Sequence, residues 1–213
     1  MKIKTILRIY NKVFPNYPIE LNRVIFDCDT LLDVGCGNSS PVRYLPERIY
    51  KIGVDAYYEC IDNSRSANLH HEYLQTDVLN IGQHFKEKTI DCVLASDLIE
   101  HLEKDRGIEL LQVMETIAKK QVIIFTPNGY FPQGSHDNNP WQIHRSGWFV
   151  DEMRGRGYSV IGINGLKCLR GDLSSIRWSP MFFWRLLSDI SQKYTRRHPK
   201  YAFQILCVKN LHE

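Results

Sequence analysis

Residues 33–37 of this chain read D-V-G-C-G. Their types and spacing suit the binding of a ligand. Gly35 and Gly37 let the backbone turn sharply and let a ligand approach it closely. A helix that starts directly after such a turn points its unpaired amide groups at that ligand. Glycines are also common in plain turns, so the surrounding residues decide. The acid Asp33, which precedes the turn, is the first supporting feature.

Two further acids follow later apolar runs at the spacing of a nucleoside site. Asp55 ends the run that comes next and lies twenty positions after Gly35. A carboxylate at that place can accept hydrogen bonds from both hydroxyls of a ribose. Asp77 follows the third run, where it would reach an adenine amino group. Aspartate after a strand also commonly caps a helix, and this alternative applies to both acids.

Short apolar runs alternate with helix-like stretches, which predicts a parallel sheet covered by helices on both faces. Residues 104–118 place apolar side chains on one helix face and are expected to form a crossover helix. Ser146 is expected to cap a helix over residues 147–154. The runs that we expect to be strands are residues 30–34, 50–54, 72–75, 90–95, 121–126, 158–163 and 203–208.

We therefore expect one α/β domain over residues 1–213, with a Rossmann-like, seven-stranded and mostly parallel sheet. The length of 213 residues and the apolar fraction of 43% suit one domain with a sizeable core. Residues 1–29 would form an N-terminal helical segment and residues 30–126 the ligand-binding core. Residues 127–213 would form the side of the site that receives the second substrate, with a lid insertion at 165–201 between the last two strands.

The order of these features resembles the class I S-adenosylmethionine (SAM) dependent methyltransferases over about residues 30–165. D-V-G-C-G resembles the first motif of that family, residues 53–55 its second-strand end, and residues 76–78 its adenine loop. Residues 97–102 (D-L-I-E-H-L) are similar to the D-x-x-E-H-L signature of the small-molecule branch. The whole chain is similar to methyltransferase-domain proteins of prokaryotes. The resemblance implies SAM as cofactor, in a pocket lined by Asp33, Gly35, Gly37, Asp55, Asp77, Val78 and Asp97.

Histidines are the candidates for acting on the methyl acceptor. His101 follows the fourth strand, whereas His136 and His144 lie after the fifth, and ligands bind at these strand ends in open α/β sheets. We expect His144, and after it His101, to serve as a general base if the acceptor must lose a proton. Hydrogen bonding to backbone is the alternative for His101, and exposure to solvent the alternative for His136. Some ubiquinone-pathway relatives bind a divalent cation through E-x-x-E-H, but most relatives bind none, so we expect no metal.

The insertion at 165–201 carries the most information about the acceptor. It holds eight basic residues against two acids, a local charge of +6, together with a group of aromatic side chains. A basic and aromatic lid suggests an anionic acceptor. The leading hypothesis is methylation of a small molecule, with oxygen acceptors slightly favoured over nitrogen. In one alternative the aromatic side chains pack the insertion onto the sheet and the arginines face solvent. In another, the run from Trp178 to Ile190 lies on a membrane surface.

Other classes of protein fit the sequence less well. No N-P-P-Y type motif follows the fourth strand, so nucleic-acid bases are disfavoured as acceptors. The six cysteines form no C-x-x-C pair, no run of apolar residues could span a bilayer, and residues 1–10 do not resemble a signal peptide. These features favour a cytoplasmic protein and do not indicate an oligomeric state. The alternatives are an NAD(P)-dependent oxidoreductase on a similar fold and a non-catalytic SAM-binding module.

Overall fold

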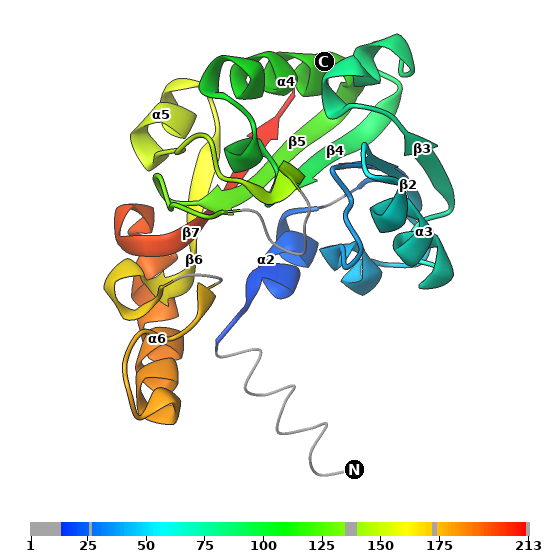
Figure 1. Cartoon of the computed structure of the whole chain (residues 1–213). Helices are drawn as coiled ribbons and strands as arrows, with labels where there is room; N and C mark the ends of the chain where they lie inside the picture. The colour runs from blue at the N-terminus through cyan, green and yellow to red at the C-terminus, as the bar shows by residue number, and fades with distance from the viewer. Residues whose placement is uncertain (1–13, 26, 135–139, 172–173, 212–213) are drawn as a thin grey trace.

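A seven-stranded sheet forms the centre of the protein, in the order β3-β2-β1-β4-β5-β7-β6 (Figure 1). The computed structural model describes residues 14–25, 27–134, 140–171 and 174–211. The strands are β1 (Thr30–Val34), β2 (Tyr50–Asp55), β3 (Glu72–Gln75), β4 (Ile90–Ser96), β5 (Ala118–Pro127), β6 (Ser159–Leu166) and β7 (Ala202–Asn210). All seven coincide with the predicted runs to within a few residues, because continuous apolar runs mark strands that are buried on both faces.

The first five strands are parallel, and only β7 runs antiparallel to its neighbours β5 and β6. The chain builds the sheet outward from β1 to β3 and then returns to place β4 on the other side of β1. The loops after β1 and β4 therefore diverge at the carboxyl ends of these strands, which is where open α/β sheets bind ligands. The predicted α/β, Rossmann-like and mostly parallel sheet is confirmed.

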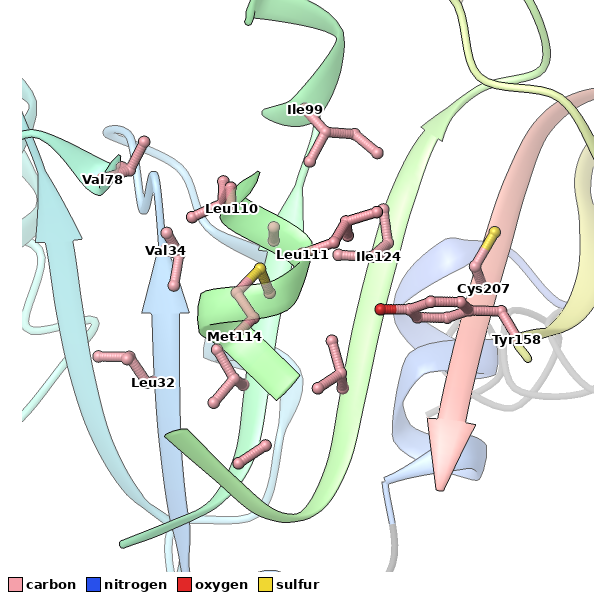
Figure 2. Packing of buried hydrophobic residues seen from close by; sticks show 14 of the residues in the cluster. Leu32, Val34, Val78, Ile99, Leu110, Leu111, Met114, Ile124, Tyr158 and Cys207 are labelled. Carbon is pink, nitrogen blue, oxygen red and sulfur yellow. The ribbon is translucent and has the colours of Figure 1, made fainter. Parts of the chain in front are cut away.

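Helices cover both faces of the sheet and close two hydrophobic cores. The helices are α2 (Tyr17–Val24), α3 (Tyr58–Ser66), α4 (Lys104–Ile117), α5 (Val150–Gly155) and α6 (Met181–Thr195). Leu110, Leu111 and Met114 of α4 pack in one cluster with Val34 of β1 and Ile124 of β5 (Figure 2). Burying such aliphatic side chains contributes about 1.5–3 kcal/mol each, so this contact fixes the crossover between β4 and β5.

The N-terminal segment contributes α2 to the opposite face. Tyr17 stacks on Phe125 of β5 with ring centroids 3.6 Å apart, and its hydroxyl donates a hydrogen bond to Ser96 Oγ at 2.9 Å. Asn16 caps the helix by accepting a hydrogen bond from the Ile19 amide. Within the segment 1–29, α2 occupies Tyr17–Val24, and residues 1–13 lie outside the described part of the chain. Among the described helices, none has the length and apolar composition needed to cross a bilayer.

The insertion between β6 and β7 forms α6, which lies directly against the edge strand β6. A Cβ atom on Gly162 would lie 2.1 Å from the Thr195 carbonyl oxygen, and one on Gly165 would lie 2.2 Å from that of Ser188. Gln192 accepts a hydrogen bond from the Gly165 amide and donates one to the Gly162 carbonyl, both at 2.9 Å. Polar side chains of α6 thus satisfy backbone groups of an edge strand that would otherwise be unpaired.

This close packing gives the first testable prediction. Gly162→Ala should lower the free energy of unfolding by about 1–3 kcal/mol, because the new methyl group overlaps backbone atoms that cannot move independently. Urea denaturation followed by circular dichroism measures the effect. Gly155→Ala is the matched control, since a Cβ at Gly155 meets nothing within 4 Å. Equal stabilities of the two variants would contradict the close contact between helix and strand.

Candidate active site

A cavity of about 640 Å³ opens at the carboxyl ends of β1, β2 and β4. This volume lies within the range of small-molecule and cofactor sites. All nine site residues predicted from the sequence line it, although they come from loops that are far apart in the chain. They are Asp33, Gly35, Gly37, Asp55, Asp77, Val78, Asp97, His101 and His144.

The loop after β1 is built around two glycines in left-handed conformation. Gly35 has φ +70° and Gly37 has φ +56°, values that residues with a Cβ rarely adopt. A Cβ on Gly37 would meet no atom within 4 Å, so its absence leaves the backbone open to a ligand. Asp55 holds the loop, because its carboxylate accepts hydrogen bonds from the amides of Gly37 and Tyr57, both at 2.9 Å. Burial raises the pKa of Asp55, and these hydrogen bonds oppose the shift.

Asp33 lies at the base of the cavity in a buried polar cluster. One carboxylate oxygen, Oδ2, accepts a hydrogen bond from Ser40 Oγ at 2.5 Å and lies 2.9 Å from His70 Nε2. The other His70 nitrogen lies 3.1 Å from Ser64 Oγ. The second Asp33 oxygen, Oδ1, is buried without a hydrogen-bond partner. A buried unpaired acceptor is costly, and a ligand carrying a donor group would relieve that cost.

His70 could not be predicted from the sequence, because it belongs to a polar stretch before β3 and has no motif of its own. His70→Ala should lower the free energy of unfolding by about 1–3 kcal/mol, since the buried Asp33 carboxylate loses a partner. Urea denaturation measures this loss, with His84→Ala as the control because His84 is an exposed histidine. A change below about 0.5 kcal/mol in the His70 variant would show that the contact is dispensable.

Asp77 and Val78 stand where β3 gives way to the short helix η2 (Val78–Gln83). Asp77 is the N-cap of η2, and its Oδ1 accepts a hydrogen bond from the Leu79 amide at 2.9 Å. The capping alternative raised from the sequence is thus observed. Asp77 nevertheless lines the cavity, so the capping bond fixes a carboxylate beside the space for a ligand.

Asp97 follows β4 in a backbone conformation that is uncommon for a residue with a side chain, at φ +47°. Its amide donates to the Phe125 carbonyl at 2.8 Å, and its Oδ1 accepts from Gln204 Nε2 at 3.0 Å. Such strained conformations cluster at functional sites. Desolvation within the cavity raises the pKa of Asp97, and the hydrogen bond from Gln204 acts in the opposite direction. Gln204, from β7, is a second site residue that carries no motif in the sequence.

Glu100, His101 and His144 meet on the other side of the cavity. Each offers one ligand atom, and these atoms lie within 4.8 Å of one another. Glu100 is buried and accepts a hydrogen bond from Thr126 Oγ1 at 2.9 Å. His144 Nδ1 lies 2.7 Å from the Phe131 carbonyl oxygen, and His101 Nδ1 lies 3.3 Å from that of Ile143. Because a carbonyl only accepts, each Nδ1 donates, and each Nε2 of the neutral ring is left as an acceptor.

The electrostatics of this cluster favour neutral imidazoles. Burial lowers the pKa of His101 to about 4, helped by the proximity of His144. Burial also lowers the pKa of His144, while the hydrogen bond to Phe131 works in the opposite direction. The pKa of Glu100 is raised well above its usual value, first by burial and then by Asp97. Two neutral imidazoles can accept a proton or, together with Glu100, hold a divalent cation.

Residues 144–148 (H-R-S-G-W) are held under η3 (Ile99–His101), which brings His144 beside His101. Ser146 Oγ and Trp148 Nε1 both donate to the Ile99 carbonyl, each at 3.2 Å. The predicted helix cap at Ser146 is wrong, because α5 begins only at Val150 and no side chain caps it. The serine instead bonds to η3.

The insertion reaches the cavity only in part. Within the described stretch of 165–201, Gly171 and Ser174 line the cavity, and α6 lies away from it. No lysine or arginine among the described residues lines the cavity. The basic residues of the insertion can therefore act on an acceptor only through their long-range field. His136 falls outside the described residues.

Comparison with known protein families and structures agrees with this geometry. Residues 32–126 match a family described as "Methyltransferase domain". This segment runs from within β1 to near the end of β5 and includes the loops that carry Asp33 to His101. No curated protein matches the chain.

Several solved structures with a similar fold are methyltransferases. One is a SAM-dependent methyltransferase from Archaeoglobus fulgidus, with a TM-score of 0.57 and 19% identity over 98% of this chain and 93% of that one. Another is the small RNA methyltransferase HEN1, with a TM-score of 0.55 and 16% identity over 100% of this chain and 26% of that one. A third is phosphoethanolamine N-methyltransferase 2 of Haemonchus contortus in complex with SAM, with a TM-score of 0.57 and 12% identity over 96% of this chain and 56% of that one.

Proposed function

We propose that this chain, whose residues 32–126 match a methyltransferase domain, uses SAM to methylate a small-molecule acceptor. The observation that carries the proposal is the division of one cavity into two ends. The loops after β1, β2 and β3 line one end, and Glu100, His101 and His144 line the other. A methyl donor and an acceptor would thus meet near the end of β4.

The first end of the cavity fits SAM. The open backbone at Gly37 would take the close approach of the cofactor, and Asp55 would accept from its ribose hydroxyls. Asp77 and Val78 would hold the adenine, and the unpaired Oδ1 of Asp33 would take a donor group. SAM supplies a methyl group on a positively charged sulfonium. The chain contributes mainly alignment, together with carboxylates that suit a cationic ligand.

At the second end, His144 would remove a proton from the acceptor. Its Nδ1–H is held by the Phe131 carbonyl, so Nε2 is the free basic nitrogen. A neutral imidazole near the acceptor favours an oxygen nucleophile slightly over an amine, because a hydroxyl gains most from losing its proton. His101, which packs edge-on against His144 at 4.8 Å, would orient it or share its role.

A second role for the same cluster is a divalent cation site. The spacing of its three ligand atoms within 4.8 Å favours it, as does the donation of both Nδ1–H groups to carbonyls, which orients histidine ligands. Turnover measured after chelation and dialysis separates the two roles. Unchanged turnover supports the base, whereas loss of turnover that Mg²⁺ or Mn²⁺ restores supports the cation.

The anionic character of the acceptor is proposed from the +6 charge of residues 165–201. Such a field acts over a Debye length of about 8–10 Å at physiological salt. An acceptor screen with radiolabelled SAM tests the proposed function, reading methyl transfer to acidic metabolites, to their neutral analogues and to a short single-stranded RNA. Transfer to an acidic metabolite is expected. Transfer to RNA alone would overturn the small-molecule assignment. RNA is included in the screen because HEN1, one of the structures with a similar fold, is a small RNA methyltransferase.

Two alternatives from the sequence are tested separately. An NAD(P)-dependent oxidoreductase would bind NADH in the same loops. A non-catalytic module would bind SAM and show no transfer to any acceptor, with the cluster at His144 unused. The assembled cluster of Glu100, His101 and His144 supports catalysis over a purely binding role.

A further inference from the structure

Helix α6 is amphipathic in the opposite sense to an ordinary surface helix. Its buried residues are the polar Ser188, Gln192 and Thr195. They face β6, where Gln192 bonds to the backbone of Gly162 and Gly165. The apolar residues of the helix therefore point away from the protein. This corrects the alternative reading in which the aromatic side chains pack the insertion onto the sheet.

The apolar residues form a continuous stripe on the outer side of α6. At 3.6 residues per turn they fall within an arc of about 140°. All are exposed, and Phe182 reaches 78% exposure. This apolar stripe consists of Phe182, Phe183, Leu186, Leu187, Ile190 and Tyr194. Contiguous exposed apolar surface of this kind marks a site of interaction.

Aromatic residues with polar tips extend the apolar stripe at both ends. Trp178 lies beside Trp184, with ring centroids 6.3 Å apart, and Tyr201 lies beside Tyr194 at 6.0 Å. The side chains of Trp178 and Tyr201 are each about half exposed. Tryptophan and tyrosine are the residues enriched where an apolar phase meets water.

Positive charge lies beside the apolar stripe and at its carboxyl-terminal end. Arg177, Arg185, Lys193 and Arg197 are exposed, and none of them forms an ion pair with another described residue. The acid of this helix, Asp189, is half-buried and pairs with Arg170 at 4.0 Å. A partner that binds here must therefore offer apolar groups to the stripe and negatively charged groups to the basic residues beside it.

We propose that the apolar stripe of α6 docks on the surface of an anionic lipid bilayer. An amphipathic helix with aromatic and basic flanks lies in the membrane interface and gains affinity from anionic headgroups. A second copy of this chain fits less well, because pairing through the same stripe would bring the basic flanks together. Figure 1 shows α6 at one edge of the molecule.

Sedimentation with lipid vesicles tests this proposal on the full chain. Vesicles of phosphatidylcholine with about one third phosphatidylserine should bind the protein at least tenfold more tightly than phosphatidylcholine alone. Two triple variants should each lose about tenfold or more of this binding: Phe182→Ser, Leu186→Ser, Ile190→Ser, and Arg185→Gln, Lys193→Gln, Arg197→Gln. All six side chains are exposed, so thermal unfolding should be nearly unchanged.

Matched controls remove the same kinds of side chain elsewhere. Tyr44→Ser with Tyr58→Ser removes exposed aromatic rings, and Lys86→Gln, Lys119→Gln, Arg154→Gln removes three exposed charges. Both controls should bind vesicles within about twofold of the wild type. Failure of the wild type to bind anionic vesicles would overturn the proposal. So would wild-type binding by the stripe variant, or a dimer in light scattering that the stripe variant abolishes. None of these readouts depends on methyl transfer.

Discussion

His144→Ala is expected to lower turnover by about 10–10⁴-fold, the range in which a positioned general base contributes. The Nδ1–H of His144 is fixed by the Phe131 carbonyl, and burial lowers its pKa, so the ring presents a neutral Nε2 to the cavity. The loops that we propose to bind SAM follow β1 to β4, whereas His144 lies after β5. Affinity for SAM should therefore stay within about twofold of the wild type.

Steady-state kinetics with an acceptor from the screen, together with calorimetric titration of SAM, measure this effect. Loss of a group that acts in the transition state lowers kcat and kcat/KM by similar factors. His84→Ala serves as the control and should retain full turnover, since His84 is exposed and does not line the cavity. Full turnover in His144→Ala, or loss of SAM affinity, would rule out His144 as the group that acts on the acceptor.

Asp55→Ala carries the second large effect. The carboxylate holds the amides of Gly37 and Tyr57 and faces the space that would take a ribose. Loss of hydrogen bonds from a charged acceptor costs about 1–3 kcal/mol. SAM affinity should therefore fall by about 5–150-fold.

Calorimetry or thermal-shift titration with SAM measures this loss. Asp62→Ala removes an exposed acid from the same helix region, α3, and should leave the affinity unchanged. Because Asp55 also supports the loop at Gly37, unfolding of the variant is measured alongside. Wild-type SAM affinity in a folded Asp55→Ala variant would place the ribose elsewhere.

The sheet, and the grouping of the residues at the end of the cavity that we propose for SAM, could be predicted because both depend on short stretches of sequence. Buried strands read as apolar runs, and the turn at Gly35 and Gly37 requires residues without a Cβ. Each acid that follows a strand is then brought to the same edge by the parallel order. This is why residues from Asp33 to Asp97 converge in one cavity.

Contacts between distant segments could not be predicted in this way. His70 reaches Asp33 across 37 positions, and Gln204 reaches Asp97 across 107. Neither residue lies in a local pattern. The face that α6 packs against the sheet could not be predicted either. Periodicity shows that a helix has two different faces but does not show which face is buried. Gly162 and Gly165 determine which face is buried, because without a Cβ atom they let the backbone of α6 pack closely against β6.

The most direct test of the central claim is a pair of calorimetric titrations of the purified chain, one with SAM and one with NADH. We expect SAM to bind at one site per chain and NADH to give no binding heat. SAM should also raise the unfolding temperature in a concentration-dependent manner, because a ligand that binds only the folded state stabilises it. Binding of NADH without binding of SAM would contradict the assignment and point to an oxidoreductase.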